Sequence, residues 1–498
     1  MNGQTLSFAL PILILLLLWA IWKKFKTSSK LLNLPPGPRK LPIIGNLHQL
    51  IGVLPHHKLR DLASKYGSVM QLQFGEVPTV IISSPESAKQ VLQTHDIIFA
   101  HRPFLLAADI ILYKAADLAF APYGDYYRQL RKICTLELFS SKRVQFFRLI
   151  REEEVSNFIR SISSSTGSPI NLTKMLHSSS CTITLRAAFG NKCALDNQEE
   201  FILVVQQVLK IVSGFSLADL FPSLKWLHAI TGVQYRLTKL RQKVDHVLEK
   251  IINGHKIARA TSKTNTEDED VLHVLLNLQE QKNLALPLTT NNIKAVILDI
   301  FIGGIDTSAT VIEWAMSELI RSPRVMQKAQ AEVRQVFDGK GIVDETMIDE
   351  LKYLKLVIKE TLRLHPPAPL LLPREACEQC QISGFDIPAK TRMFVNVWAL
   401  GRDPNYWYEA EKFFPERFIG SPIEYKGGNF EYLPFGYGRR TCPGSLFGLA
   451  NVELPLAYLL YQFDWELPNA KNKEDLDMAE EFSTVARRQN DLYLIPTM

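Results

Sequence analysis

The distribution of apolar residues predicts a short apolar span at the start of the chain. Residues Leu6–Trp22 are apolar apart from Ser7 and Pro11, and a helix of this length spans roughly 26 Å, at the short end for crossing a bilayer. Three lysines follow at positions 23, 24 and 26, and positive charges stay on the cytoplasmic side. A cleaved secretory signal is the alternative, but a basic n-region and a small-residue cleavage site are absent. We expect residues 1–26 to form a single membrane anchor, with the remaining chain in the cytosol.

A proline-rich hinge and a mainly helical body follow the expected anchor. Residues 27–42 contain Leu34-Pro35-Pro36-Gly37-Pro38, and prolines fix φ and resist helix formation. In the body, residues 43–498, strand-like runs occur at Ser68–Phe74 and Thr79–Ser83. Apolar residues spaced every three to four positions predict several long helices: Phe201–Ser213, Val233–Ile252, Asn292–Arg321 and Pro323–Phe337. We expect one domain after the hinge, mainly α with a smaller β portion.

Composition excludes several classes of protein. The chain has 498 residues, of which 46% are hydrophobic and 22% charged, which is ordinary globular usage and excludes a disordered chain. The net charge is 57 − 51 = +6, too small an excess for the dense basic stripe of a nucleic-acid-binding protein. Six cysteines are too few for a disulfide scaffold, and we expect them to be mostly reduced thiols.

The chemistry is concentrated around Cys442. The segment from Phe435 to Gly444 reads F-G-Y-G-R-R-T-C-P-G, and an apolar helix follows it. Gly436 and Gly438 permit tight turns close to a flat partner. A cysteine at a helix start lies near free N–H groups that favour its thiolate, and an axial thiolate helps iron to cleave an O–O bond. A buried cysteine is by itself most often inert core, so the surrounding pattern carries this interpretation.

This pattern, F-x-x-G-x-R-x-C-x-G, resembles the haem-binding loop of cytochromes P450, the haem-thiolate monooxygenases. The resemblance covers essentially the whole chain, because Glu360-Thr361-Leu362-Arg363 is similar to the family's E-x-x-R helix and Pro415-Glu416-Arg417-Phe418 to the segment whose arginine joins it. It implies the cytochrome P450 fold, with Cys442 as axial ligand of haem b (iron protoporphyrin IX) and Phe435, Gly436 and Gly438 beside the haem. E-x-x-R alone is a common surface ion pair, and only the order of the motifs makes it specific.

The glycine pair Gly303-Gly304 lies inside the expected helix 292–321 and is followed by Asp306-Thr307. Two glycines cost roughly 1 kcal/mol each relative to alanine, and they let a flat cofactor or O₂ approach closely. The resemblance implies that Asp306 passes protons inward and that the Thr307 hydroxyl donates to bound dioxygen. A packing seam, with Thr307 bonded back to the Gly303 carbonyl, is the alternative.

Three arginines, Arg131, Arg374 and Arg440, are implied as partners of the haem propionates. Arg131 ends Tyr127-Arg128-Gln129-Leu130-Arg131, where the family usually has W-x-x-x-R. Tyr127 in place of the tryptophan puts the geometry at one propionate in doubt. A solvated helix face is the alternative for Arg131.

The resemblance also implies the reaction and its setting. The chain is similar to plant microsomal members of the terpenoid- and alkaloid-oxidising branch, which places it on the cytosolic face of the endoplasmic reticulum as a single-pass protein. It implies hydroxylation of an apolar small molecule with O₂ and electrons from NADPH through NADPH–cytochrome P450 reductase. A terpenoid (mono-, sesqui- or diterpene) is the expected substrate; alkaloid or phenolic oxidation, an O₂-independent haem-thiolate isomerase or dehydratase, and a non-enzymatic haem sensor are the alternatives.

Four segments are implied to line the substrate pocket, namely Pro103–Tyr113, Leu298–Asp306, Ala368–Leu372 and Phe482–Ala486. Their apolar side chains predict an apolar substrate: Leu105, Leu106, Ile110, Ile302, Leu370, Leu371 and Phe482. Asp109 and Asp299 are the exceptions and are expected to point elsewhere.

Overall fold

The computed structural model describes residues 32–498 apart from 191–194, 213–216, 225–229, 262–269, 282–283, 340–342, 427, 469–471 and 483–484. The expected membrane anchor, residues 1–26, and the first five residues of the hinge lie outside the described residues. Within them, Thr290–Arg321 is long and apolar enough to cross a membrane, but 67% of its most apolar window is buried inside the protein. We therefore interpret this segment as a core element.

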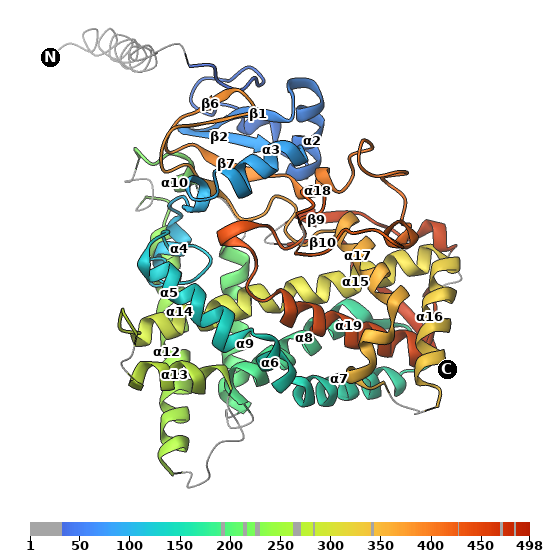
Figure 1. The fold of residues 1–498 in the computed structure, drawn as a ribbon. Coiled ribbons are helices and arrows are strands. Elements are labelled where there is room, and N and C mark those ends of the chain that lie inside the picture. Colours follow the sequence, from blue (N-terminus) through green and yellow to red (C-terminus); the bar gives the residue numbers. More distant parts are fainter. Residues whose placement is uncertain are drawn as a thin grey trace, which may run out of the picture.

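The main sheet and the long helices occupy different parts of the molecule (Figure 1). The main sheet has the order β1-β2-β7-β4. Strand β1 (Val69–Phe74) pairs antiparallel with β2 (Val77–Ile82), and β2 pairs in parallel with β7 (Arg392–Val395), which also pairs antiparallel with β4 (Arg374–Glu375). The two strands expected from the early apolar runs are confirmed, and β2 begins two residues before the expected start.

The described part of the hinge lies against this sheet. The amide of Gln71 in β1 donates to the Pro36 carbonyl oxygen at 2.8 Å. A Cβ on Gly37 would lie 1.9 Å from the Gln71 carbonyl oxygen, so a residue with a side chain cannot occupy this position without displacing the backbone. Pairing of β1 with this segment ties the start of the described chain to the body.

Three small strand groups accompany the main sheet. Strand β11 (Tyr493–Thr497) pairs with β3 (Ile170–Asn171) and with β8 (Asp464–Glu466). The remaining strands form two hairpins: β5 (Cys380–Ile382) with β6 (Phe385–Ile387), and β9 (Glu480–Phe482) with β10 (Ala486–Arg488).

Long helices form the rest of the body. Helix α15 (Asp306–Arg321) packs against α8 (Leu172–Phe189) and α19 (Ser445–Gln462), and Figure 1 shows α14 (Thr290–Gly304), α15 and α19 crossing the middle of the molecule. Between Ser308 and Ile320 all thirteen residues of α15 are buried. The other helices are α2 (Pro55–Tyr66), α3 (Pro85–Lys89), α4 (Leu106–Ile111), α5 (Asp125–Ile133), α6 (Ser141–Phe146), α7 (Arg148–Ser163), α9 (Leu195–Val212), α10 (Leu217–Leu220), α12 (Val233–Thr261), α13 (Val271–Gln281), α16 (Pro323–Phe337), α17 (Lys352–Leu364) and α18 (Val397–Leu400).

The single helix expected over residues 292–321 is two helices, α14 and α15, that meet at Ile305. A capping box between Thr289 and Asn292 begins α14. The two glycines that end α14 are poor helix formers, and the Thr307 hydroxyl donates to the Gly303 carbonyl oxygen at 2.7 Å. The break therefore falls beside the expected site residues.

Candidate active site

The loop of residues 435–444 is closed on itself before α19 begins. Gly436 and Gly438 adopt φ angles of 67° and 76°, a region that favours glycine. The amide of Cys442 donates to the Phe435 carbonyl oxygen at 2.9 Å. These two turns and this bond close the loop directly before α19, which begins three residues after Cys442.

Gly438 contacts the preceding part of the protein closely. A Cβ at this position would lie 2.5 Å from the Leu92 carbonyl oxygen and 2.6 Å from Asp96 Oδ1. The carboxylate of Asp96 in turn accepts bonds from the Arg439 amide at 2.9 Å and from Arg439 Nη1 at 3.1 Å. The close partner of Gly438 is thus the protein's own chain, which fixes the loop to residues 92–96.

The thiol of Cys442 is exposed. The protein surrounding it nevertheless desolvates its charged form, and this burial raises the pKa of Cys442 against the lowering by the Gly444 backbone N–H and by Arg131. The expected contribution of the helix start is present, because the Gly444 N–H lowers the pKa of the thiol, while desolvation by the surrounding protein acts in the opposite direction and is larger. A metal cation would supply the missing compensation, because a coordinating thiol is deprotonated.

Arg440 and Arg374 are held beside the loop. Arg440 donates to the carbonyl oxygens of Ala100 at 2.7 Å and Leu118 at 3.1 Å, and burial lowers its pKa to about 10. Arg374 is buried and donates to Asp96 at 3.1 Å and to the Tyr437 carbonyl oxygen at 2.9 Å. Both guanidinium groups are thus fixed close to the loop that carries Cys442.

Arg131 and Tyr127, both on α5, also contact this loop. Arg131 Nη1 donates to the Thr441 carbonyl oxygen, directly before Cys442. The Tyr127 hydroxyl donates to the Arg439 carbonyl oxygen, and its ring centroid lies 3.9 Å from the Arg440 guanidinium carbon. Tyr127, buried and only 2% exposed, therefore supports the loop and orients Arg440.

Arg102 is a fourth arginine of this cluster that sequence reasoning missed. It donates to the carbonyl oxygens of Ala119 at 2.8 Å, Leu372 at 2.9 Å and Pro373 at 2.7 Å. Burial lowers its pKa well below the usual range, and the charges of Arg440 and Arg374 lower it further. In the sequence Arg102 is marked only by its position directly before Pro103, and no sequence pattern indicates that it lies close to Arg374 and Arg440.

The E-x-x-R pair is buried, in contrast to the surface pairs that this motif usually forms. Glu360 and Arg363 are 0% and 1% exposed, and two bonds of 2.8 Å join them side by side. Arg417 Nε donates to the same carboxylate at 2.9 Å, as does the Phe414 amide at 2.8 Å. The expected three-residue network is therefore present.

The network is connected to the Cys442 loop through α17. The Tyr432 hydroxyl donates to the carbonyl oxygen of Lys359, which directly precedes Glu360, at 3.0 Å. Tyr432 is buried, and three residues later the loop of residues 435–444 begins. The position of α17 thus determines where the chain enters the loop.

At the break between α14 and α15, the two glycines have different surroundings. A Cβ on Gly303 would meet nothing within 4 Å, whereas one on Gly304 would lie 3.5 Å from Thr184 Oγ1. Gly303 is therefore the position where another group could approach the helix. The Thr307 hydroxyl uses its proton on the Gly303 carbonyl, which leaves its oxygen lone pairs to accept.

Asp306, the first residue of α15, contacts α8. Its Oδ1 atom lies 3.2 Å from Nδ1 of His177. The side chains keep 25% and 23% of their surface exposed. His177 was not singled out in the sequence, because 129 residues separate it from Asp306.

Asp299, which we expect to point away from the substrate, bonds to the loop before α5. Its carboxylate accepts the amides of Leu118 at 2.5 Å and Ala119 at 3.2 Å. Burial raises the pKa of Asp299 well above the usual range, and the neighbouring Asp117 charge raises it further; burial also raises the pKa of Asp117 to about 6. Asp117 and Asp299 are thus two adjacent buried carboxyl groups, and the charge of Asp117 disfavours ionisation of Asp299.

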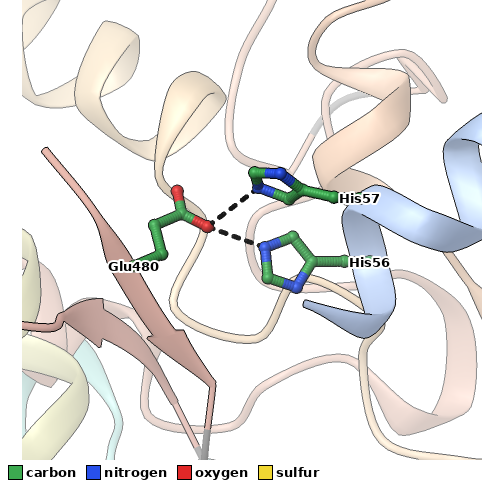
Figure 2. A group of neighbouring side chains, drawn as sticks. All are labelled: His56, His57 and Glu480. Atoms are coloured by element: carbon green, nitrogen blue, oxygen red, sulfur yellow. Dashed lines mark hydrogen bonds and ion pairs between the residues drawn. The ribbon is translucent and has the colours of Figure 1, made fainter. Parts of the chain in front are cut away.

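A separate cluster joins α2 to β9. His56 and His57 both point to Glu480 Oε2, with Nε2–Oε2 distances of 2.7 and 3.1 Å (Figure 2). Ligand atoms of these three residues lie within 4.8 Å of one another, the spacing of a possible metal site. The carboxylate is already bonded to both imidazoles, and Arg402 adds positive charge that disfavours a cation. We interpret the cluster as a hydrogen-bonded clamp between distant parts of the chain.

The residues around Cys442 fit a haem by their chemistry. The exposed thiol is a ligand for iron. Burial lowers the pKa values of Arg102, Arg374 and Arg440, and neighbouring arginine charges lower those of Arg102 and Arg440 further, so carboxylates of a cofactor would be favourable partners here. Arg131, Arg374, Arg440 and Arg102 are therefore the residues that would hold the propionates.

Comparisons with known proteins agree with this geometry. A family model described as Cytochrome P450 matches residues 35–494. Desmethyl-deoxy-podophyllotoxin synthase of Sinopodophyllum hexandrum is 53% identical, over 99% of this chain and 98% of its own length. Tabersonine 16-hydroxylase 1 of Catharanthus roseus is 53% identical (95% and 94% covered), and premnaspirodiene oxygenase of Hyoscyamus muticus 52% (96% and 94%).

Further relatives at 51–52% identity are named as plant cytochromes P450 of subfamily 71D. A solved zebra fish cytochrome P450 with progesterone has the same fold, with a TM-score of 0.77 and 24% identity over 90% of this chain and 100% of its own. With the Cys442 loop, the E-x-x-R network and the interrupted central helix, these matches lead to one assignment. The chain belongs to the cytochrome P450 family of haem-iron monooxygenases and is similar to its plant 71D members.

Proposed function

We propose that the protein hydroxylates an apolar plant specialised metabolite, a terpenoid, with Cys442 as the axial ligand of haem b. The observation that carries this proposal is the loop of Cys442, an exposed residue three positions before α19, together with the arginines held beside this loop, whose charges lower the pKa of Arg102 further than burial alone. Bound haem supplies the redox chemistry that inserts one atom of O₂ into a C–H bond and reduces the other to water, with two electrons and two protons.

The residues of this chain hold the cofactor, fix the loop that carries Cys442 and transfer protons. Arg131, Arg374, Arg440 and Arg102 hold the cofactor carboxylates, and the buried Glu360 network fixes the loop of residues 435–444. Thr307 offers its hydroxyl oxygen at the break between α14 and α15, where Gly303 leaves open space. Asp306, a quarter exposed, takes protons from solvent and passes them to the Thr307 side.

Apolar side chains of the implied substrate segments support an apolar substrate. Leu371 lies 3.6 Å from a Cβ built on Gly436 and is half-buried, as is Ile302. Leu370, in contrast, is buried in a core cluster with residues of α2 and β1, so it contributes to the packing of that part of the fold. The side chain of Phe482 lies outside the described residues.

The relatives support the terpenoid class and one alternative. The name premnaspirodiene oxygenase describes oxygenation of a diene, which favours a hydrocarbon substrate here. The name tabersonine 16-hydroxylase 1 describes hydroxylation of tabersonine, so alkaloid hydroxylation by the same chemistry is the second candidate.

The setting we propose is the cytosolic face of the endoplasmic reticulum, with NADPH–cytochrome P450 reductase as electron donor and residues 1–26 as anchor. Exposed apolar side chains occur at the end of the hinge and just after it, and they support a membrane-facing surface there: Leu41 (47%), Ile43 (67%), Ile51 (77%) and Val53 (47%).

Two measurements test the proposal. The reduced carbon monoxide complex should absorb at the position typical of thiolate-bound haem, and Cys442→Ser should abolish this band and the activity. Microsomes containing the protein, reductase and NADPH should then be incubated with a terpene and alkaloid panel, with mass analysis of the products. Oxygen consumption that is matched by product would exclude the O₂-independent isomerase, whereas product formation without O₂ would overturn the proposal.

A further inference from the structure

Asp306 is held by His177, a residue of α8 that the proposed function does not use. His177 Nδ1 lies 3.2 Å from Asp306 Oδ1, and both side chains keep about a quarter of their surface exposed. Asp306 directly precedes Thr307, whose hydroxyl is bonded at the helix break. The pair therefore contacts solvent on one side and lies next to the break on the other.

The pair belongs to a polar seam between α8 and α15. One turn before His177, the Thr173 hydroxyl donates to Glu313, which lies two turns after Asp306. Glu313 is 2% exposed, and Arg488 Nε lies 3.9 Å from its carboxylate. Asp306 and Glu313 are thus the carboxylates that face His177 from α15, and Asp306 is the one in contact with it.

We propose that His177 is the positioning residue for Asp306: it holds the carboxylate on the α8 side of the break, so that protons enter the reaction through Asp306. This inference rests on the proposed function. The overall reaction there is RH + O₂ + 2e⁻ + 2H⁺ → ROH + H₂O. The competing reaction, which consumes electrons without oxidising the substrate, is O₂ + 2e⁻ + 2H⁺ → H₂O₂. In water both protons are on one oxygen atom, whereas in hydrogen peroxide each oxygen atom carries one proton. The position of the proton donor therefore decides which of these two products forms.

The test compares two substitutions in the holoenzyme with reductase and NADPH. Premnaspirodiene is the first substrate probe, followed by any compound that the terpene and alkaloid panel identifies. In His177→Phe, product formed per NADPH should fall about ten-fold with KM unchanged, the lower end of the cost of losing a group that orients a reacting residue. His177→Asn keeps an N–H donor near the position of Nδ1 and should restore most of the wild-type ratio.

A reaction that needs no NADPH distinguishes a positioning role of His177 from a general loss of enzyme activity. Turnover driven by cumene hydroperoxide brings its own reduced oxygen and needs no NADPH, so it should remain at the wild-type rate in His177→Phe. Thr173→Val removes the neighbouring contact of the same seam and should destabilise the protein without changing product per NADPH. His246→Phe, at an exposed histidine of α12, is the matched surface control.

A thermal cycle tests the contact without any turnover. If His177 and Asp306 interact, the shifts of the unfolding midpoint in His177→Phe and Asp306→Asn should not add in the double variant. Additive shifts, a wild-type product ratio in His177→Phe, or an equal loss of hydroperoxide-driven turnover would each overturn the inference while leaving the proposed function intact. A wild-type protein without a thiolate-type carbon monoxide band and without NADPH-dependent products would overturn both.

Discussion

Glycines near Cys442 show how one residue type meets different requirements. Gly438 combines a φ of 76° with protein atoms 2.5 and 2.6 Å from the position of a Cβ. Gly436 has a similar φ of 67°, but its nearest neighbour is the flexible Leu371 side chain at 3.6 Å. The backbone conformation restricts both positions, and only Gly438 also lacks space.

Gly438→Ala should therefore be more damaging than Gly436→Ala. The left-handed conformation costs an alanine roughly 1–2 kcal/mol at either position. At Gly438 the added methyl group also meets the Leu92 carbonyl and Asp96, so the loop has to move and thiolate-bound haem should be lost. Unfolding midpoints and the carbon monoxide spectrum measure both effects, and equal losses in the two variants would contradict the steric argument.

At the scale of secondary structure elements, α17 connects the buried ion network to the Cys442 loop. Glu360 accepts from Arg363, Arg417 and the Phe414 amide, so one carboxylate joins α17 to the segment around residue 414. The polar side chains face one another in a dry region, where an unpaired charge is costly. The network thus specifies how α17 and the following segment pack.

Glu360→Gln should destabilise the protein strongly. It removes the negative charge that two arginines share, and breaking a buried ion pair costs about 3–5 kcal/mol. The matched control is Arg324→Ala, because Arg324 is 62% exposed and its bond to Glu416 at 2.6 Å should contribute under about 1 kcal/mol. Urea unfolding of both variants measures the difference, and similar losses would show that the Glu360 network does not stabilise the fold.

The whole molecule shows which features the sequence could predict. Local periodicity predicted α16 with its observed ends, and the F-x-x-G-x-R-x-C-x-G pattern indicated the loop, because both depend on neighbouring residues. The contacts of Arg102 with Leu372 and Pro373 and that of His177 with Asp306 could not be predicted, since folding brings these partners together from more than a hundred positions away. The desolvation that raises the pKa of the Cys442 thiol could not be predicted either, because a helix start is visible in the sequence and the packing around the thiol is not.

The clamp between α2 and β9 also depends on the whole fold, since 424 positions separate His56 from Glu480. Burial alone would raise the pKa of Glu480, but hydrogen bonds from His365, His56 and His57 hold it far below the usual value. Burial lowers the pKa of His56 below 6.5, against the raising effect of Glu480. In the folded protein His56 is therefore neutral, and Glu480 is ionised.

Acid should weaken this clamp. Below pH 6.5 the unfolded chain binds a proton at His56 that the folded protein does not bind. The free energy of unfolding therefore has its full value above this pH and decreases below it, by at most about 1.4 kcal/mol per pH unit. Protonation of Glu480 in the unfolded chain adds to the decline below pH 4.5. His56→Gln keeps an N–H donor but cannot titrate. The amount by which its free energy of unfolding lies below that of wild type should therefore decrease from pH 7.5 to pH 5.5, as measured by urea unfolding. His246→Gln, on the surface of α12, should follow the wild-type curve, and a constant deficit for His56→Gln would show that His56 is not held neutral by the fold.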